Sequence, residues 1–199
     1  MYTCKQIRDI VKSRVKYEHR SSTIQDQDYF DLIKRGIKRC HRVLTGINYN
    51  FYKKVNKSYN LVYSVDSIVA FPSDLYKVIA WLANPTEATP TEMNTYHWCE
   101  MSNGTNRGLY SAIKDSDGTD SGIEGSLTYI REPDMPTNWA STPDLPDGYD
   151  DWLIQYVLAE SMSIASTDPR IDMTKLQELD QMIIQMNQRG GAAGQAAAS

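Results

Sequence analysis

The sequence has little cysteine and no long apolar segment, and both shortages exclude classes of protein. Its three cysteines, Cys4, Cys40 and Cys99, lie far apart and show no Cys-x-x-Cys spacing. An odd, scattered set argues against a disulfide framework and against a zinc site. No run of about 18 apolar residues is present, so we expect no membrane-spanning segment. The first residues carry charges where a signal peptide needs an apolar stretch, which favours a protein made and kept in a reducing cytoplasm.

The sequence also lacks the motifs that carry catalysis. Its histidines, His19, His41 and His97, fit no metal-binding spacing, and no phosphate-binding glycine loop or G-x-S-x-G motif is present. We expect His41 on a surface or an interface, while His97 and the nearby Cys99 have no third group to orient them. The acidic run at residues 115–120 resembles the start of a calcium loop, but its sixth position is not glycine, so we interpret it as a polar loop. The sequence therefore predicts no enzyme, no cofactor and no metal site.

Charge is distributed unevenly along a chain whose length suits one domain. Residues 1–57 carry 14 Lys and Arg against 5 Asp and Glu, a net charge of +9. Residues 58–199 carry 7 against 20, a net charge of −13. Such polarity could bind nucleic acid, or let copies pack head to tail with opposite charges facing. Two solvated faces of unequal sign explain it equally well.

Apolar residues recur at helical spacing near both ends of the chain. Residues 3–16 are expected to form a helix with Thr3 as its N-cap, and residues 26–44 a second, stronger helix. Residues 149–165 and 172–186 show the same spacing, with a break at Asp168-Pro169 between them. The chain is therefore expected to begin and end with a pair of helices.

Between these helices the pattern changes to that of β-structure. Residues 48–71 are rich in Tyr and Val and predict a hairpin or meander. Further along we expect, in order, a one-turn start and a strand over 75–83, a short helix over 91–101, short strands at 109–113 and 127–131, and an extended Pro-rich connector over 132–148.

The economical architecture is a single α+β domain over residues 1–199. It is expected to be mainly a helical bundle built from the N- and C-terminal helices, with an inserted β-rich region and an extended C-terminal tail. Its expected parts are helices over 1–46, the β-rich insert over 47–131, the connector over 132–148, helices over 149–189 and the tail over 190–199.

A set of five cations forms a basic face on the second expected helix: Lys34, Arg35, Lys38, Arg39 and Arg42. They could follow a phosphate backbone. No turn and recognition helix follows them, and the overall sequence is acidic, so a solvated face is the better interpretation. An interface with an acidic partner is the third option.

Two further features suggest contact with other chains. The sequence has thirteen Tyr and four Trp but only three Phe, a composition that suits either interfaces or ordinary strands. Trp139 lies in the connector, where its apolar ring needs another group to cover it. The last ten residues have no large side chain and cannot pack a core of their own. We predict that this tail lies on a neighbouring chain; its residues are Gly190, Gly191, Ala192, Ala193, Gly194, Gln195, Ala196, Ala197, Ala198 and Ser199.

Three runs resemble the head-to-tail connector proteins, or adaptors, of tailed bacteriophages. They are DYFDLIKRGIKRCHRVL at residues 28–44, FPSDLYKVI at 71–79, and DLPDGYDDWLIQYVLAESMSIASTDPRIDMTKLQELDQMI at 144–183. The last run is the clearest, because it places a break between a helix of small and apolar residues and a second amphipathic helix. Residues 84–131 have no counterpart in the resemblance.

The resemblance implies a structural virion protein without catalytic activity. Such adaptors form a ring, usually of twelve copies, beneath the portal, where it extends the DNA channel and docks the next neck or tail protein. Double-stranded DNA passes through during packaging and ejection, and the tails reach the portal or the adjacent subunit. The implied location is the neck of the virion, after synthesis in the host bacterial cytoplasm.

Two other functions stay open. One is a stopper or tail-completion protein, which also forms a ring but attaches below the adaptor. The other is a small DNA-binding protein that uses the basic helix at residues 34–42, and it predicts salt-dependent affinity for duplex DNA.

Overall fold

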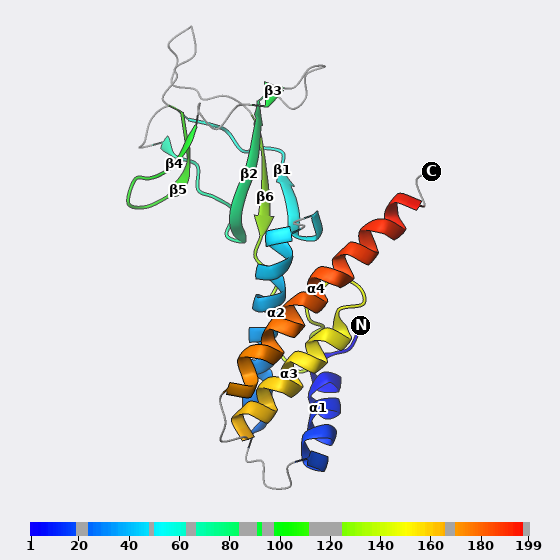
Figure 1. Ribbon diagram of the computed structural model, residues 1–199. Helices are drawn as coiled ribbons and strands as arrows, with labels where there is room; N and C mark the ends of the chain where they lie inside the picture. Colours follow the sequence, from blue (N-terminus) through cyan, green and yellow to red (C-terminus); the bar gives the residue numbers. More distant parts are fainter. Residues whose placement is uncertain are drawn as a thin grey trace, which may run out of the picture. The chain divides into compact units, whose positions relative to one another are not determined.

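The computed structural model describes residues 1–18, 24–47, 50–62, 67–83, 91–92, 98–111, 125–165 and 170–196 (Figure 1). It is an α+β protein that divides into two compact units. Met1–Phe51 and Pro133–Ser199 form one, the helical unit; Tyr52–Glu132 forms the other, the β unit. The predicted α+β class, with helices from both ends of the chain packed together, is thereby confirmed.

Four helices make up the described part of the helical unit. They are α1 (Cys4–Glu18), α2 (Asp26–Ile47), α3 (Asp150–Ala165) and α4 (Arg170–Ala196). Helix α3 packs against each of the other three and lies between α1 and α4 (Figure 1). The predicted bounds of α1, α2 and α3 agree with these to within three residues.

The start of α1 is held by a capping box and by the connector. Thr3 N–H donates to Oε1 of Gln6 at 2.8 Å, and the Gln6 N–H donates to Oγ1 of Thr3 at 3.3 Å, which confirms Thr3 as the N-cap. The next two orphan N–H groups, of Cys4 and Lys5, donate to carbonyls of the connector at 2.9 and 3.0 Å. The connector therefore caps the N-terminal end of α1 through the carbonyl groups of Trp139 and Ser141.

Helices α2 and α3 approach closely at a glycine. A Cβ atom on Gly36 would lie 2.5 Å from Cδ1 of Leu153 and 2.8 Å from the ring of Tyr156, so only glycine fits there without a shift. The indole Nε1 of Trp152, which is fully buried, donates to the carbonyl of Leu179 on α4 at 2.8 Å. These contacts place α3 at the centre of the apolar core.

Helix α4 is longer than expected. The sequence predicts a helix end near Met186 and an extended tail from Gly190, whereas α4 continues to Ala196. The extended conformation predicted for residues 190–196 is therefore wrong, and residues 197–199 lie outside the described part. Alanine is the best helix former, and adding residues to an existing helix costs far less than starting one, so the Ala-rich end continues α4.

The β unit contains two antiparallel sheets. The larger has the order β1-β6-β2-β3 and the smaller pairs β4 with β5. The strands are β1 (Lys53–Asn56), β2 (Leu75–Ala83), β3 (Thr91–Glu92), β4 (Cys99–Ser102), β5 (Arg107–Tyr110) and β6 (Gly125–Arg131). The strands predicted at 109–113 and 127–131 correspond to β5 and β6, with shifted bounds.

The expected helix over 91–101 is wrong where the structure describes it, because β3 and β4 occupy those residues; 93–97 lie outside the described part. An Asn-Gly turn selects the hairpin β4–β5 instead. Asn103 Oδ1 accepts the N–H groups of Thr105 and Asn106 at 3.0 and 2.8 Å, and Gly104 has a φ of +87°. Turn chemistry here overrides helical spacing.

Other strand boundaries in the β unit also differ from the prediction. The segment 75–83 is a strand from its first residue, without the expected helical turn. In place of the hairpin expected over 48–71, β1 pairs with β6, and Val62 makes only an isolated bridge to Tyr110. Residues 63–66 lie outside the described part.

Trp81 on β2 centres the core of the β unit. It is fully buried, and its Nε1 donates to the carbonyl of Tyr59 at 2.9 Å. A Cβ on Gly125 would lie 2.0 Å from the Trp81 ring, so the indole lies directly against the β6 backbone. The Tyr59 hydroxyl donates to the carbonyl of Val69 at 2.7 Å and accepts the Leu109 N–H at 3.2 Å. These bonds hold irregular loop backbone against both sheets.

Candidate functional site

The five cations predicted as a basic face all lie on α2, but the structure does not leave them as one free set. Arg39 forms an ion pair with Asp180, and Arg35 lies 4.0 Å from Glu160 of α3. Lys34 is half-buried with its Nζ 4.5 Å from the centre of the Phe30 ring. Only Lys38 and Arg42 are exposed without such a neighbour in the described part of the chain.

The Arg39–Asp180 pair is the strongest electrostatic contact of this face. The Arg39 guanidinium donates from Nε to Oδ1 and from Nη2 to Oδ2 of Asp180, each at 2.8 Å. Hydrogen bonding to Asp180 raises the pKa of Arg39, with burial opposing it. The two side chains are 32% and 30% exposed, so the pair closes the side of α2 that faces α4.

The helical unit is close to neutral overall, although the sequence is strongly divided in charge. Residues 1–51 and 133–199 together carry 14 Lys and Arg against 15 Asp and Glu. Basic α1 and α2 meet acidic groups within the unit: Arg8 and Lys12 both bind Asp26. Much of the polarity is therefore neutralised inside one chain.

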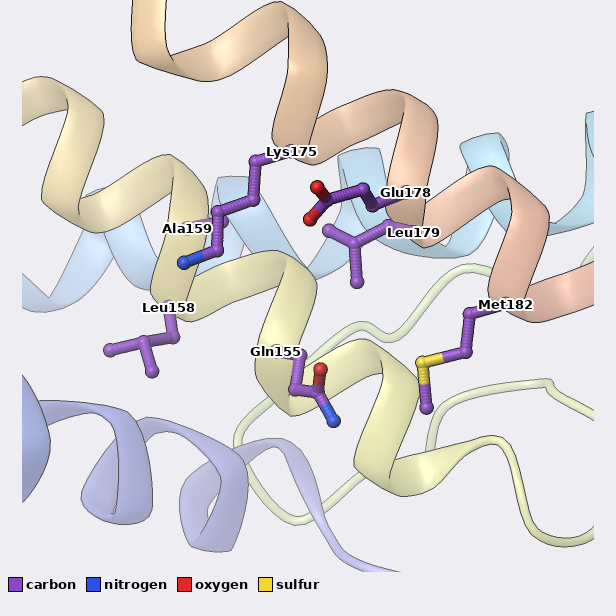
Figure 2. Close-up of a pocket in the computed structure, with 7 residues that line it drawn as sticks. All are labelled: Gln155, Leu158, Ala159, Lys175, Glu178, Leu179 and Met182. Carbon is purple, nitrogen blue, oxygen red and sulfur yellow. The ribbon is translucent and has the colours of Figure 1, made fainter.

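A groove lies between α3 and α4 in the helical unit. It has a volume of about 360 Å³, and Figure 2 shows its lining from both helices. Gln155, Leu158 and Ala159 come from α3; Lys175, Glu178, Leu179 and Met182 come from α4. A smaller hollow of about 180 Å³ adjoins it at Ala159. The combination of an apolar floor and a charged rim suits a helix or side chains of another protein better than a reactive substrate.

Sequence reasoning missed this groove, although the sequence contains a signal for it. Four residues of α3, Asp151, Gln155, Leu158 and Met162, fall on one helix face at spacings of four, three and four. The structure leaves all four exposed or half-buried. We name this face the outer stripe of α3, and its two apolar members are only partly covered by the bundle.

The potentially reactive side chains are poorly placed for catalysis. Burial raises the pKa of Cys4 to about 11, and burial raises that of Cys40 as well, so both thiols stay protonated. His41 is 4% exposed, so its expected surface position is wrong; the inward face of α2 extends around to it. Cys99 is exposed and free, while His97 and residues 115–120 lie outside the described residues. Among the residues described, no three His, Cys, Asp or Glu side chains gather as metal ligands.

Trp139 in the connector finds its cover within the helical unit. Its ring lies 4.9 Å from that of Phe30, centre to centre, and the Arg8 guanidinium lies 4.7 Å above it. This side chain is thus part of the bundle and not a free interface residue. None of the helices in the described ranges is long and apolar enough to cross a bilayer.

The chain matches no protein-family model and no curated protein sequence.

Proposed function

We propose that this chain is a head-to-tail adaptor of a tailed-bacteriophage virion. In this role it forms a ring, usually of twelve copies, under the portal protein. The ring extends the DNA channel, lets double-stranded DNA pass during packaging and ejection, and docks the next neck or tail protein. It is a structural role in the virion neck, without catalysis or a cofactor.

The observation that carries the proposal is the joining of the two resembling helical runs in one bundle. Residues 28–44 lie in α2, and residues 144–183 include α3 and the first half of α4. These helices pack pairwise against each other although they come from opposite ends of the chain. The resemblance predicts such a bundle, with the β-rich region inserted between its halves.

The tail contact belongs to the same proposal. Residues 190–199 are proposed to reach the portal or the adjacent subunit, and over Gly190–Ala196 they do so as the end of a helix. A helix whose residues are mostly alanine and glycine allows close backbone approach to another chain.

The DNA-binding alternative has less support from the geometry. A reader of duplex DNA needs several free cations along one helix, yet Arg39 is bound to Asp180 by two hydrogen bonds and Arg35 lies beside Glu160. The stopper or tail-completion alternative shares the ring and differs in what the ring attaches to.

Native mass measurement on neck complexes released from particles tests the proposal. A ring of twelve chains of 22.6 kDa has a mass of about 271 kDa, and we expect it bound to a second ring, the portal. A ring that attaches only below another adaptor would favour the stopper. A monomer or dimer without a structural partner in intact particles would contradict both ring functions.

A further inference from the structure

Two oppositely charged pairs of side chains have no ion-pair partner among the described residues of the helical unit. On α2 they are Lys38 and Arg42; at the start of α3 they are Asp147 and Asp151. All four are exposed, and none makes an ion pair within the described part of the chain. By contrast Asp150, next to Asp151, lies 3.6 Å from the amino group of Met1.

Within one chain these pairs point away from each other. Gly36 marks the side of α2 that faces α3, and at about 100° per residue Lys38 and Arg42 lie about 200° and 240° around the helix from it. On α3, Leu153 marks the side that faces α2, and Asp151 lies about 200° from it. Lys38 and Arg42 therefore do not face Asp151 inside one molecule.

The members of each pair are four residues apart in sequence. Lys38 and Arg42 are one helical turn apart, about 6 Å along the axis. Asp147 lies before α3 begins at Asp150, in a turn where the Tyr149 N–H donates to the Pro146 carbonyl at 3.2 Å and Gly148 has a φ of +86°. Each surface thus carries two charges of one sign, and the two signs are opposite.

Beyond Asp151, the outer stripe of α3 continues along the groove as Gln155 and Leu158. The aliphatic stems of Lys and Arg cover such apolar surface while their charged ends reach a carboxylate. On the far rim, the Glu178 carboxylate is offset by the Lys175 ammonium, so the negative charge of this side comes from Asp147 and Asp151 (Figure 2). A basic helix face therefore fits here in both charge and polarity.

We propose that the Lys38–Arg42 face of α2 docks on Asp147 and on the outer stripe of α3, as far as Leu158, in a second copy of this chain. Two different surfaces meet, so every copy keeps one of each free, and the contact repeats until a ring closes. The inference deepens the proposed adaptor function, because it names the contact by which copies join. It rests on the charges and the orientation above.

Charge reversal with mutual rescue tests the contact. In the full chain, K38E/R42E makes both surfaces acidic and D147K/D151K makes both basic. Each variant alone is expected to lose self-association by about 100-fold, because like charges then face one another. An equimolar mixture is expected to recover it, since every contact between unlike copies is again complementary. Sedimentation at about 0.01 M and about 1 M salt should show association mainly at low salt.

The matched control is K5E/R14E, which reverses the same number of charges at exposed positions of α1 and should associate as the original chain does. Circular dichroism checks folding, because Lys at the start of α3 opposes the helix dipole. If D147K/D151K unfolds, D147N/D151N replaces it, and alone it should weaken association. Its mixture with K38E/R42E should form dimers but no larger assembly, because only one of the two contacts between unlike copies keeps the native charges.

Several results would overturn the inference. They are a monomeric original chain at low salt, variants that associate normally, and variants that fail to recover on mixing. Loss of duplex-DNA affinity in K38E/R42E with unchanged association would assign α2 to DNA instead. An unchanged 271 kDa ring in the variants would leave the adaptor function standing and place the contact elsewhere. If mixing rescues association but particles contain no ring of this chain, the contact between copies would stand and the adaptor function would fall.

Discussion

Arg39 on α2 and Asp180 on α4 join the two ends of the chain through a two-pronged ion pair. Both hydrogen bonds are 2.8 Å long, and 141 residues separate the partners in sequence. The pair lies beside the buried Tyr156, whose pKa is raised to about 12 by burial and by the Glu160 carboxylate. A cation that sequence analysis assigns to a free basic face thus has a structural role.

A double-mutant cycle on Arg39→Ala and Asp180→Ala should show a coupling free energy of about 1 kcal/mol, because the pair is bidentate but one-third exposed. Urea unfolding followed by circular dichroism measures it. The matched control is the cycle on Arg35 and Glu160, which lie 4.0 Å apart with Arg35 58% exposed, and its coupling should be close to zero. Equal coupling free energies in the two cycles would mean that the two hydrogen bonds between Arg39 and Asp180 add no stability.

The close approach of α2 and α3 predicts opposite effects for two glycine substitutions in the same helix. Gly36→Ala should destabilise the helical unit by about 1–3 kcal/mol, because its Cβ would overlap Leu153 and Tyr156. Gly46→Ala meets nothing within 4 Å and should stabilise α2 by up to about 1 kcal/mol. Thermal unfolding of both variants checks this. Equal melting temperatures would mean that the two helices pack less closely than the structure has them.

The lowered pKa of Asp74 predicts that the β unit loses stability in acid. Burial raises its pKa, but hydrogen bonds from Lys54 at 2.7 Å and the Tyr129 hydroxyl at 2.9 Å outweigh burial and lower it overall. A carboxyl group with a lowered folded pKa stabilises the protein above its unfolded pKa of about 3.9, and this contribution is lost as pH falls through the folded value.

Hydrogen exchange of the β6 amides between about pH 5 and pH 3 measures that loss. Asp74→Asn should lower protection at pH 5 and make it less dependent on pH. At the alkaline end, Tyr129 has its pKa raised to about 12, mainly by burial and then by Asp74. Ionising it should destabilise the β unit between about pH 10 and pH 12, and Tyr129→Phe should remove that step. An acid response unchanged in Asp74→Asn would assign it to another carboxylate.

The helices were predictable because their pattern is local. The spacing of Ile7, Val11 and Val15 marks the buried face of α1, and Thr3 with Gln6 contains the capping box in four residues. The β unit depends on distant pairings instead. The position of β6 follows from the contact between Gly125 and Trp81, which no local pattern reveals.

The candidate surfaces show the same division. Residue type alone identifies the five cations of α2, but it cannot show that Arg39 is bound while Lys38 is free, because that depends on where Asp180 lies. The outer stripe of α3 can be recognised from its helical spacing in the sequence. The groove beside Leu158 cannot, because it forms only where α3 packs against α4. A groove between two helices depends on how segments distant in sequence pack together, and no local sequence pattern predicts that packing.

The end of α4 gives the last prediction, because helix and extended tail respond differently to the same change. Gly190 and Gly191 lie inside α4 as the structure has it. Replacing both by alanine should stabilise the helix end by about 1 kcal/mol for each glycine, because glycine loses more backbone freedom in a helix. Amides 190–196 should then exchange more slowly, and far-ultraviolet circular dichroism should gain helix signal. Ala198→Gly, beyond the described helix, is the control and should leave both unchanged. Exchange at unfolded rates in the original chain and in the variant alike would mean that the tail is extended, as its composition first predicts.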